Sequence, residues 1–352
     1  MSEIIKSQNI LHTQRIKPNI VVVGSINCDL TTYVANFPKL NETVMAKHAA
    51  LTLGGKGLNQ AVAAARAGGS VTMVACVGDD HFGALAVKYL NANSVNTTHV
   101  HSASACATGT ATILVDENAN NMIVVAPGAN AALTVAHVQA AESVIAEADM
   151  VIVQMEVPLE SVMAALKMAE KYSVPSILNP APASIDVLEL LPLARIFTPN
   201  ETEMELLSGI YPNSHESIAE GVDKLRALGA EIVIITKGSE GCSIACDDNF
   251  THINAYKVAA VDPTGAGDVF NGVLAVAIIA ASKLCDGVFD AQVIEHAVRQ
   301  ASAAATLSVT KQSAEGAAPL AAEIERFLAM HVEQNLTAPS YSECKTYNKN
   351  LI

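Results

Sequence analysis

Short apolar runs rich in β-branched residues alternate along this chain with longer stretches rich in Ala and Leu. Six such runs have the length of buried strands, at residues 19–26, 71–78, 150–156, 173–180, 195–200 and 231–238. Between them, residues 58–68, 158–172 and 216–229 have helical periodicity and end at Gly or a polar turn. The alternation predicts βαβ units, and therefore a three-layer α/β/α core with a mostly parallel sheet.

Two segments interrupt this alternation. Residues 30–53 and 108–125 alternate polar and apolar side chains, contain β-branched residues and have no helical pattern. We expect them to form antiparallel strands away from the main sheet, as a small lid with strands from about residues 28–53 and 108–126. A strand pair with an apolar outer face tends to pair with a copy of itself, so the lid predicts a homodimer.

The length of 352 residues suits one large α/β domain with a small appendage. We expect this domain at residues 18–330, between an N-terminal extension at residues 1–17 and a polar, aperiodic tail at residues 331–352. The N-terminal extension lacks the apolar core of a secretory signal, and the seven scattered cysteines suit a reducing compartment. These features predict a cytoplasmic protein.

Charge and hydropathy restrict the partners. The net charge of −14, without basic clusters, argues against nucleic acid or an anionic membrane surface. The longest apolar runs, such as residues 273–281, are shorter than the roughly 20 residues that span a bilayer. We therefore expect small-molecule ligands, and an anionic ligand would need local positive groups.

The sequence DPTGAGDVFNG, residues 262–272, places Gly265, Ala266 and Gly267 directly before an apolar helical run, with Asp268 in its first turn. Gly disfavours a helix by about 1 kcal/mol relative to Ala, so the arrangement needs a reason. One interpretation is a tight loop that leads into a buried helix. The other is an anion site, because N–H groups at a helix start lack partners within the helix and can bind a phosphate.

Polar groups also follow the first predicted strand, where GSINCD replaces the GxGxxG pattern of dinucleotide-binding folds. Asn27 and Asp29 alternate at the end of this strand, so both side chains face one side at the carboxyl edge of the sheet, unless an Asx turn explains them. The GGKG sequence that follows lacks P-loop spacing. It offers donors for a polyol, or forms a solvated turn, at Gly55, Lys56 and Asn59.

Asn200 and Glu203 in TPNETE have the spacing of a capping box at a helix start. Glu203 could instead orient water around Mg²⁺, because Mg²⁺ bound with a nucleotide keeps several waters. The ITKGSEG sequence, residues 235–241, is either a plain turn after a strand or part of a nucleotide-binding site. The ten histidines form no HxxxH or triad-like group, which argues against a metalloprotease or a Ser-His-Asp hydrolase.

Taken in order, these segments resemble the PfkB-type, or ribokinase, family of carbohydrate and nucleoside kinases. The resemblance runs from about residue 19 to residue 328 through GSINCD, ETV, GGKGLNQAVAAARAG, GDDHFG, TGTATILVDE, GANAAL, MEVPLESV, LNPAPA, TPNETE, ITKGSEG, AVDPTGAGDVFNG and AAATLSVT. It implies a ribokinase-like fold and ATP-dependent phosphorylation of the primary hydroxyl of ribose, O5, which gives ribose 5-phosphate and ADP.

By this resemblance Asp268 is the general base, and Gly265, Ala266 and Gly267 form the anion hole for the transferring phosphoryl group. The sugar-contacting positions that it implies, besides Asp268, are Asn27, Asp29, Gly55, Lys56, Asn59 and Glu156. The implied nucleotide-side positions are Asn200, Thr236, Gly238, Gly241 and Gly267, with Glu203 near Mg²⁺ through water.

Members of this family are commonly activated by K⁺ or a similar cation beside the anion hole. The resemblance implies such a site from oxygen atoms of Asp262 and Thr264, with carbonyl groups near Ser308, Lys311 and Ser313. The sequence departs from the family where Gly is usually followed by Ser four residues later, because it has Ser313 and Ala317 there. The second position therefore carries no hydroxyl for the cation.

Two other functions stay open from the sequence. The same fold could act on deoxyribose, fructose, another ketose or a nucleoside, although an aromatic content of 4% without Trp offers few platforms for a nucleobase. A non-catalytic sugar-binding protein is the other alternative. The intact GAGD sequence that contains Asp268 argues against it.

Overall fold

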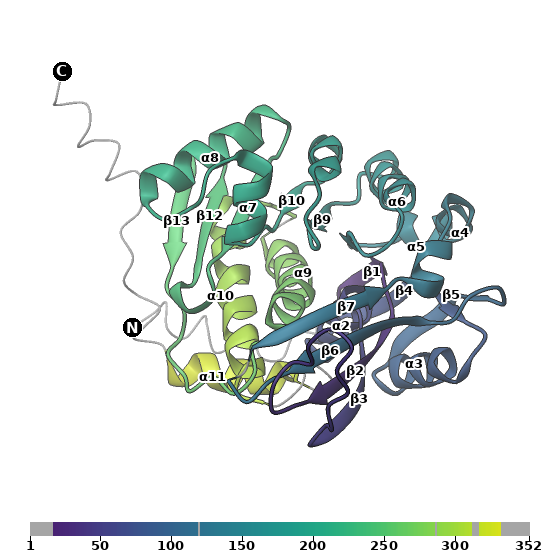
Figure 1. Ribbon diagram of the computed structural model, residues 1–352. Coiled ribbons are helices and arrows are strands. Elements are labelled where there is room, and N and C mark those ends of the chain that lie inside the picture. Colours follow the sequence, from purple (N-terminus) through teal and green to yellow (C-terminus); the bar gives the residue numbers. More distant parts are fainter. Residues whose placement is uncertain (1–16, 119, 286, 312–316, 332–352) are drawn as a thin grey trace.

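The computed structural model describes residues 17–118, 120–285, 287–311 and 317–331, so the predicted tail and most of the predicted N-terminal extension lie outside the described residues. A nine-stranded sheet forms the middle layer (Figure 1). Its strands in spatial order are β13 (Asn249–Ile253), β12 (Cys242–Cys246), β11 (Ile232–Thr236), β10 (Ile196–Phe197), β9 (Ser176–Asn179), β8 (Met150–Gln154), β1 (Asn19–Val23), β4 (Ser70–Gly78) and β5 (Val95–Ala103). From β11 to β5 all neighbours are parallel, whereas β12 and β13 are antiparallel.

The order of the strands reverses beside β1. From β1 the chain moves outward to β4 and β5, and then returns to the other side of β1, where β8, β9, β10 and β11 follow in order. The carboxyl ends of β1 and β8 therefore flank the topological switch point, where open α/β sheets bind ligands.

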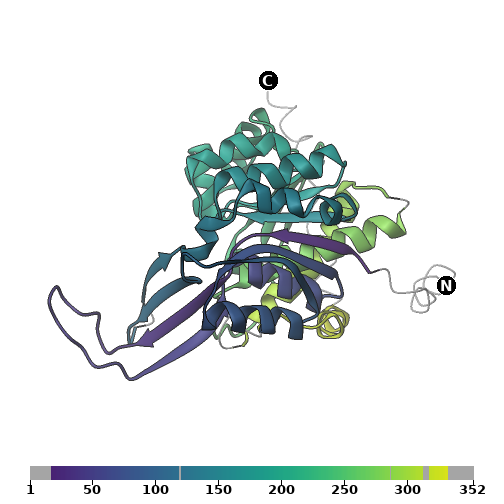
Figure 2. The ribbon, with the colours of Figure 1, turned by 90° about the vertical axis from the view of Figure 1, so that its right-hand side faces the viewer.

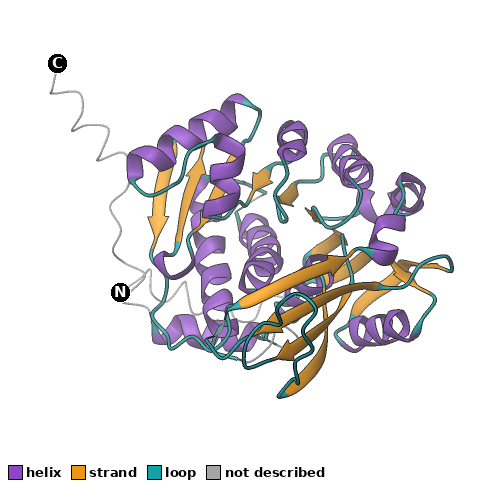
Figure 3. Ribbon diagram, in the orientation of Figure 1, coloured by secondary structure: helices purple, strands orange, loops and turns teal. Residues whose placement is uncertain are grey.

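Alternating side chains build one core on each face of the sheet, as Ile20 and Val22 of β1 face one core and Val21 and Val23 face the other. The first core is covered by α2 (Lys56–Arg66), α3 (His81–Ala92), α9 (Ala266–Leu284), α10 (Ala291–Ser308) and α11 (Ala321–Met330). The second is covered by η2 (Gly128–Ala132), α4 (Val135–Ala140), α5 (Glu142–Ala146), α6 (Leu159–Lys171), η3 (Ile185–Leu193), α7 (Glu201–Ser208) and α8 (His215–Ala227). The helices lie on both sides of the strands in Figure 3, which confirms the predicted α/β/α fold.

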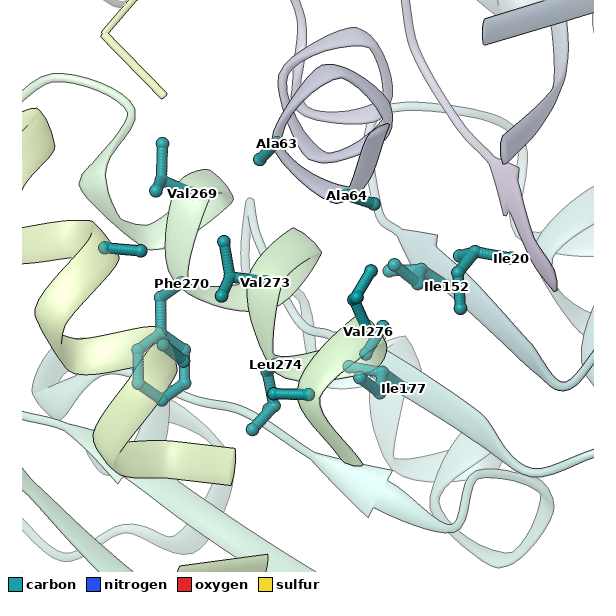
Figure 4. Packing of buried hydrophobic residues seen from close by; sticks show 14 of the residues in the cluster. Ile20, Ala63, Ala64, Ile152, Ile177, Val269, Phe270, Val273, Leu274 and Val276 are labelled. Carbon is teal, nitrogen blue, oxygen red and sulfur yellow. The ribbon is translucent and has the colours of Figure 1, made fainter. Parts of the chain in front are cut away.

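Helix α9 runs through the first core, where Val273 and Val276 lie near Ala63 and Ala64 of α2 (Figure 4). A methyl group added at Gly272 would lie 2.4 Å from the carbonyl oxygen of Gln60, so glycine lets α2 and α9 approach closely. By length and hydropathy α9 qualifies as a membrane span, yet 78% of its apolar window is buried inside the fold, as in a core helix.

A second, four-stranded sheet projects from the layers (Figure 2) and is called the lid sheet below. Its order is β3 (His48–Gly54), β2 (Asn27–Tyr33), β6 (Gly109–Val115) and β7 (Asn121–Ala126). The prediction of antiparallel strands is wrong for the central pair, because β2 and β6 are parallel. They follow β1 and β5, which run in one direction in the main sheet, so both segments leave its carboxyl edge in the same direction.

Candidate active site

Segments far apart in the sequence meet at the switch point between β1 and β8. Ser25 follows β1, and its Oγ donates to Oε2 of Glu156, which follows β8, at 2.5 Å. The same Oε2 accepts the backbone N–H of Lys56, the first residue of α2, at 3.1 Å. Since the N-cap residue Gly55 has no side chain, Glu156 satisfies a donor of this helix start from outside the helix.

Asp268 lies in the first turn of α9, where its side chain is 7% exposed and faces α2. Its Oδ2 accepts a hydrogen bond from Nδ2 of Asn59, and its Oδ1 accepts one from Nε2 of Gln60, both at 3.0 Å. The close packing of α2 on α9 thus brings the predicted base to the predicted sugar contact Asn59, which stands 209 residues earlier.

The glycines before Asp268 open the start of α9. Gly265 is the N-cap residue with a φ of 77°, in the left-handed region that favours glycine. A methyl group added at Gly267 would meet no described atom within 4 Å. No side chain of the described residues caps this helix start. Because helix N-termini carry a partial positive charge, the first turn is accessible to an anion beside the Asp268 carboxylate.

Asn27 and Asp29 lie on β2 of the lid sheet, so the prediction that they end the first strand is wrong. The chain leaves the main sheet after β1 and enters the lid sheet at Asn27. At this passage the buried side-chain amide of Asn130, and not a neighbouring strand, pairs with the backbone N–H and carbonyl of Ile26, at 2.8 and 3.1 Å. Nδ2 of Asn130 also donates to Oδ1 of Asn27 at 2.7 Å. The Asn27 amide therefore has a fixed orientation at the carboxyl edge of the main sheet.

Burial raises the pKa of Asp29 to about 6, with further contributions from the nearby carboxylates of Glu156 and Asp268. Among the described residues, no hydrogen-bond donor reaches its buried Oδ1. A buried carboxylate oxygen without a donor is unfavourable, and a ligand hydroxyl would supply the missing hydrogen bond.

Lys56 lies among carboxylates. Although burial acts to lower the pKa of Lys56, the negative charges of Asp268, Glu156 and Glu203 raise it. Burial in turn raises the pKa of Glu203, against the backbone hydrogen bond from Asn200 and the charge of Lys56. The predicted sugar-side and nucleotide-side residues therefore share one electrostatic environment.

The predicted capping box at α7 is present. Oδ1 of Asn200 accepts the backbone N–H of Glu203 at 2.9 Å, and Oε2 of Glu203 accepts that of Asn200 at 2.8 Å. Asn200 also forms an isolated parallel bridge with Thr236 at the end of β11. These residues lie at the carboxyl ends of β10 and β11, on the sheet edge that carries Glu156.

A short turn follows β11, the three-ten helix η4 (Gly238–Glu240). Gly238 has a φ of 48° with open space beside its Cα, and Gly241 has a φ of 103°. A methyl group at Gly241 would lie 2.0 Å from the carbonyl oxygen of Ile253, so this glycine is required by packing. Of these two glycines, only Gly238 has open space beside its Cα in which a ligand could lie.

Of the predicted cation residues, Asp262, Ser308 and Lys311 come together near the end of α10. The backbone N–H groups of Val261 and Asp262 donate to the carbonyl of Val309 at 2.7 and 3.1 Å, which holds the loop beside Ser308. Oδ1 of Asp262 accepts the N–H of Thr264 at 2.9 Å. The N–H of Lys311 donates to the carbonyl of Ser308 at 3.0 Å, and Ser313 lies outside the described residues.

In the part of the chain that the structure describes, no three His, Cys, Asp or Glu side chains gather as a metal cluster. Glu203, which is predicted to act on Mg²⁺ through water, uses its Oε2 to accept the backbone N–H of Asn200.

Sequence reasoning missed several polar residues that complete the site. They are buried, and each is hydrogen-bonded to a predicted residue or to another member of the set: Ser25, Gln60, Asn130, Gln154, Asn179, Thr198 and Asn271. Six of them lie inside sequences that carry the family resemblance, and Gln154 is a polar side chain at the end of the apolar strand β8. Such residues are hydrogen-bonded in most folds, and the pattern does not identify the partner.

Comparisons with known proteins agree with this arrangement. A family model described as pfkB family carbohydrate kinase matches residues 17–321. The chain is 37% identical to a ribokinase of Haemophilus influenzae, with 89% of the chain and 99% of that protein covered. It is 32% identical to a deoxyribokinase of Salmonella typhi over the same shares. The structure of Arabidopsis thaliana ribokinase complexed with ribose and ATP superposes with a TM-score of 0.79 and 28% identity, over 89% of this chain and 99% of that one.

Proposed function

The chain belongs to the pfkB family of carbohydrate kinases, and from this membership we propose that it transfers the γ-phosphoryl group of ATP to O5 of ribose. The products are ribose 5-phosphate and ADP. The observation that carries the proposal is the position of Asp268, a buried carboxylate beside the open, uncapped start of α9.

In the proposed reaction, O5 of the sugar attacks the γ-phosphorus as the bond to the β–γ bridging oxygen breaks. The hydroxyl proton passes to the carboxylate of Asp268, which is the general base. Charge on the transferring phosphoryl group is stabilised by N–H groups at Gly265, Ala266 and Gly267. The N–H of Ala266 donates to the carbonyl of Pro263 at 3.2 Å without the nucleotide and would turn to, or be shared with, the phosphoryl group. Gly267 lets the phosphate approach because the space beside its Cα is open.

The sugar would bind between the lid sheet and α2. Asn27 and Asp29 from β2, Gly55, Lys56 and Asn59 at α2, and Glu156 after β8 offer donors and acceptors for its hydroxyl groups. Oδ1 of Asp29, which no donor reaches within the part of the chain that the structure describes, is the strongest single argument for a polyol here, because a hydroxyl group can donate to it without adding a charge.

The nucleotide would lie along the carboxyl ends of β10 and β11, at Asn200, Thr236 and Gly238, with Gly241 shaping the turn. Mg²⁺ supplies neutralisation of phosphate charge, and Glu203 would orient its water ligands. A monovalent cation such as K⁺ would bind near Asp262, Thr264 and the carbonyl of Ser308, and would stabilise the loop before the anion hole.

The test is ADP release with ribose and MgATP by the full chain and by Asp268→Asn. We expect turnover with ribose and a decrease in kcat of at least about 10²-fold in the variant, as for other general bases. Asp223→Asn, at an exposed position of α8, is the matched control and should keep full activity. Equal turnover by Asp268→Asn would remove this residue from the reaction and contradict the proposal.

Deoxyribose is the second candidate acceptor, because the deoxyribokinase of Salmonella typhi is nearly as similar as the ribokinases. A site built to hydrogen-bond a hydroxyl rejects the analogue that lacks it, so kcat/KM for ribose and deoxyribose separates the two. The same comparison of kcat/KM should include fructose and a nucleoside as further acceptors.

The lid sheet would also form a homodimer. Its outer strand β7 exposes Met122, Ile123, Val124 and Val125, between 47% and 70% of each side chain. An exposed apolar edge strand tends to pair with another copy, which removes the unpaired edge and covers the apolar groups.

A further inference from the structure

Gln60 is a fully buried amide whose three hydrogen-bonding groups all have partners. Its Nε2 donates to Oδ1 of Asp268 at 3.0 Å and to Oδ1 of Asn179 at 3.1 Å. Its Oε1 accepts from Nε2 of Gln154 at 2.7 Å. A primary amide has two N–H donors, so both are used here and neither is left for a ligand.

The hydrogen bonds continue from Gln60 and return to the backbone beside Asp268. Nδ2 of Asn179 donates to the carbonyl of Thr198 at 3.3 Å, and Oγ1 of Thr198 donates to Oδ1 of Asn271 at 2.7 Å. Nδ2 of Asn271 donates to the carbonyl of Gly267 at 2.9 Å. A closed ring of buried groups from α2, β9, the end of β10 and α9 therefore links the carboxylate to the helix turn that carries it.

The carboxylate of Asp268 determines which end of the Gln60 amide faces it, because an ionised carboxylate only accepts hydrogen bonds. Asn179 favours the same orientation, since its Nδ2 donates to the carbonyl of Thr198 and its Oδ1 is left to accept from Gln60. If the Gln60 amide turned over, its Oε1 would face the Oδ1 atoms of Asp268 and Asn179, and buried polar groups without partners are strongly unfavourable. Gln154 supports this orientation by donating to Oε1 of Gln60. Gln60 is thus held as a donor to Asp268.

We propose that Gln60 is a positioning residue for the phosphoryl transfer, and that Gln154 acts through it. By holding Oδ1 of Asp268, the ring fixes the plane of the carboxylate and leaves Oδ2, on the side of Asn59, for the acceptor hydroxyl. The inference rests on the proposed role of Asp268 as general base. It assigns no substrate contact to Gln60, because both of its N–H groups are already used.

The first test is Gln60→Met, which keeps the volume of the side chain and removes the donor. We expect kcat with ribose to fall about 10- to 100-fold, the range for misplacement of a reacting group by about 1 Å. KM for ribose and for MgATP should stay within about threefold, because no substrate contact is lost. In the Asp268→Asn background the same substitution should cause no further loss, since there is no carboxylate to orient.

Gln154→Met is the second variant, and it tests the orientation of the Gln60 amide without a change at Asp268. Among the described residues Oε1 of Gln154 has no hydrogen-bond partner, so the substitution removes one hydrogen bond and one unsatisfied acceptor, and folding should be preserved. We expect a smaller fall in kcat, and no added effect on Gln60→Met. If Gln60→Met does not fold, the proposal is tested by Gln154→Met alone, and an unchanged kcat in that variant would contradict it.

Ser161→Ala is the structural control, because Ser161 is fully buried on the other face of the sheet and donates to the carbonyl of Leu133 at 2.7 Å. It should lower the melting temperature without a change in kcat. The positioning role is overturned if a folded Gln60→Met keeps kcat within twofold, if KM rises in place of the fall in kcat, or if the loss is equally large in the Asp268→Asn background. Undiminished activity of Asp268→Asn itself would instead overturn the proposed function, and the positioning role with it.

Discussion

Asp29→Asn should stabilise the folded protein while it removes sugar binding. Burial, which disfavours the charged form, raises the pKa of Asp29 in the folded chain from its ordinary value of 3.8 to about 6. One pKa unit corresponds to about 1.4 kcal/mol, so ionised Asp29 costs the folded state about 2 to 3 kcal/mol near neutral pH. Asparagine has the same shape and carries no charge, so it avoids this cost.

The upward shift of the Asp29 pKa determines how the stability difference between Asp29→Asn and the wild type depends on pH. Below pH 3.8 the group is protonated in both the folded and the unfolded chain, and the two proteins should differ little in stability. Between pH 3.8 and about 6 only the unfolded chain ionises, so the wild type loses stability relative to the variant as the pH rises. Above about pH 6 the difference is constant, and at pH 5 it is roughly half of its full size.

Urea unfolding of the ligand-free proteins at pH 5, 6, 7 and 8 measures this difference, and calorimetry with ribose measures binding. Asp223→Asn, an exposed carboxylate on α8, should leave stability unchanged at every pH. The reasoning would be refuted if Asp29→Asn were no more stable than the wild type at pH 8, or if its gain were the same at pH 5. A variant that still bound ribose normally would show that the Asp29 oxygen is not a sugar ligand.

Three further substitutions test other parts of the site. Gly267→Ala should raise stability by up to about 1 kcal/mol, because Ala favours a helix and meets no neighbour, yet lower kcat about 10²-fold by blocking the anion; a folded variant with normal kcat would contradict the anion hole. Glu203→Gln should keep the capping box and the melting temperature but raise the Mg²⁺ concentration for half-maximal activity about 10-fold, and an unchanged requirement would limit Glu203 to the cap. Val124→Asp on β7 should convert a dimer to a monomer in sedimentation velocity, whereas an unaltered mass would place any dimer contact elsewhere.

The alternation of apolar runs was sufficient to predict the layered fold, because strand and helix periods are set by local geometry. It did not predict the parallel pairing of β2 with β6, since pairing depends on where two distant strands leave the main sheet. The same limit explains the position of Asn27 and Asp29. Their alternation is visible in the sequence, but the passage of the chain from β1 to the lid sheet at Ile26 is held by Asn130, which lies more than a hundred residues away.

The site was predicted best where a local motif carries the chemistry. Asp268 and the glycines before it stand together in the sequence, and so do Asn200 and Glu203, whose capping box is present. Gln60 lies within the GGKGLNQAVAAARAG sequence, but nothing local assigns it a role, because that role depends on a long-range contact with Asp268 that exists only when α2 packs on α9. The close approach requires Gly272, the last residue of the DPTGAGDVFNG sequence, to which the sequence analysis assigns no role of its own.

The charges of the site explain why backbone donors, rather than basic side chains, would bind the transferring phosphate. The carboxylates of Asp268, Glu156 and Glu203 already act on Lys56 and raise its pKa. A second cation close to Asp268 would pair with that carboxylate, which would weaken it as a proton acceptor and reduce the positive charge available to the phosphate. The N–H groups at the start of α9 carry no net charge and point along the helix, so they can stabilise an anion while Asp268 beside them stays a base. The glycine-rich helix start and the buried amide ring thus meet one requirement, which is to orient a carboxylate next to an anion without neutralising either.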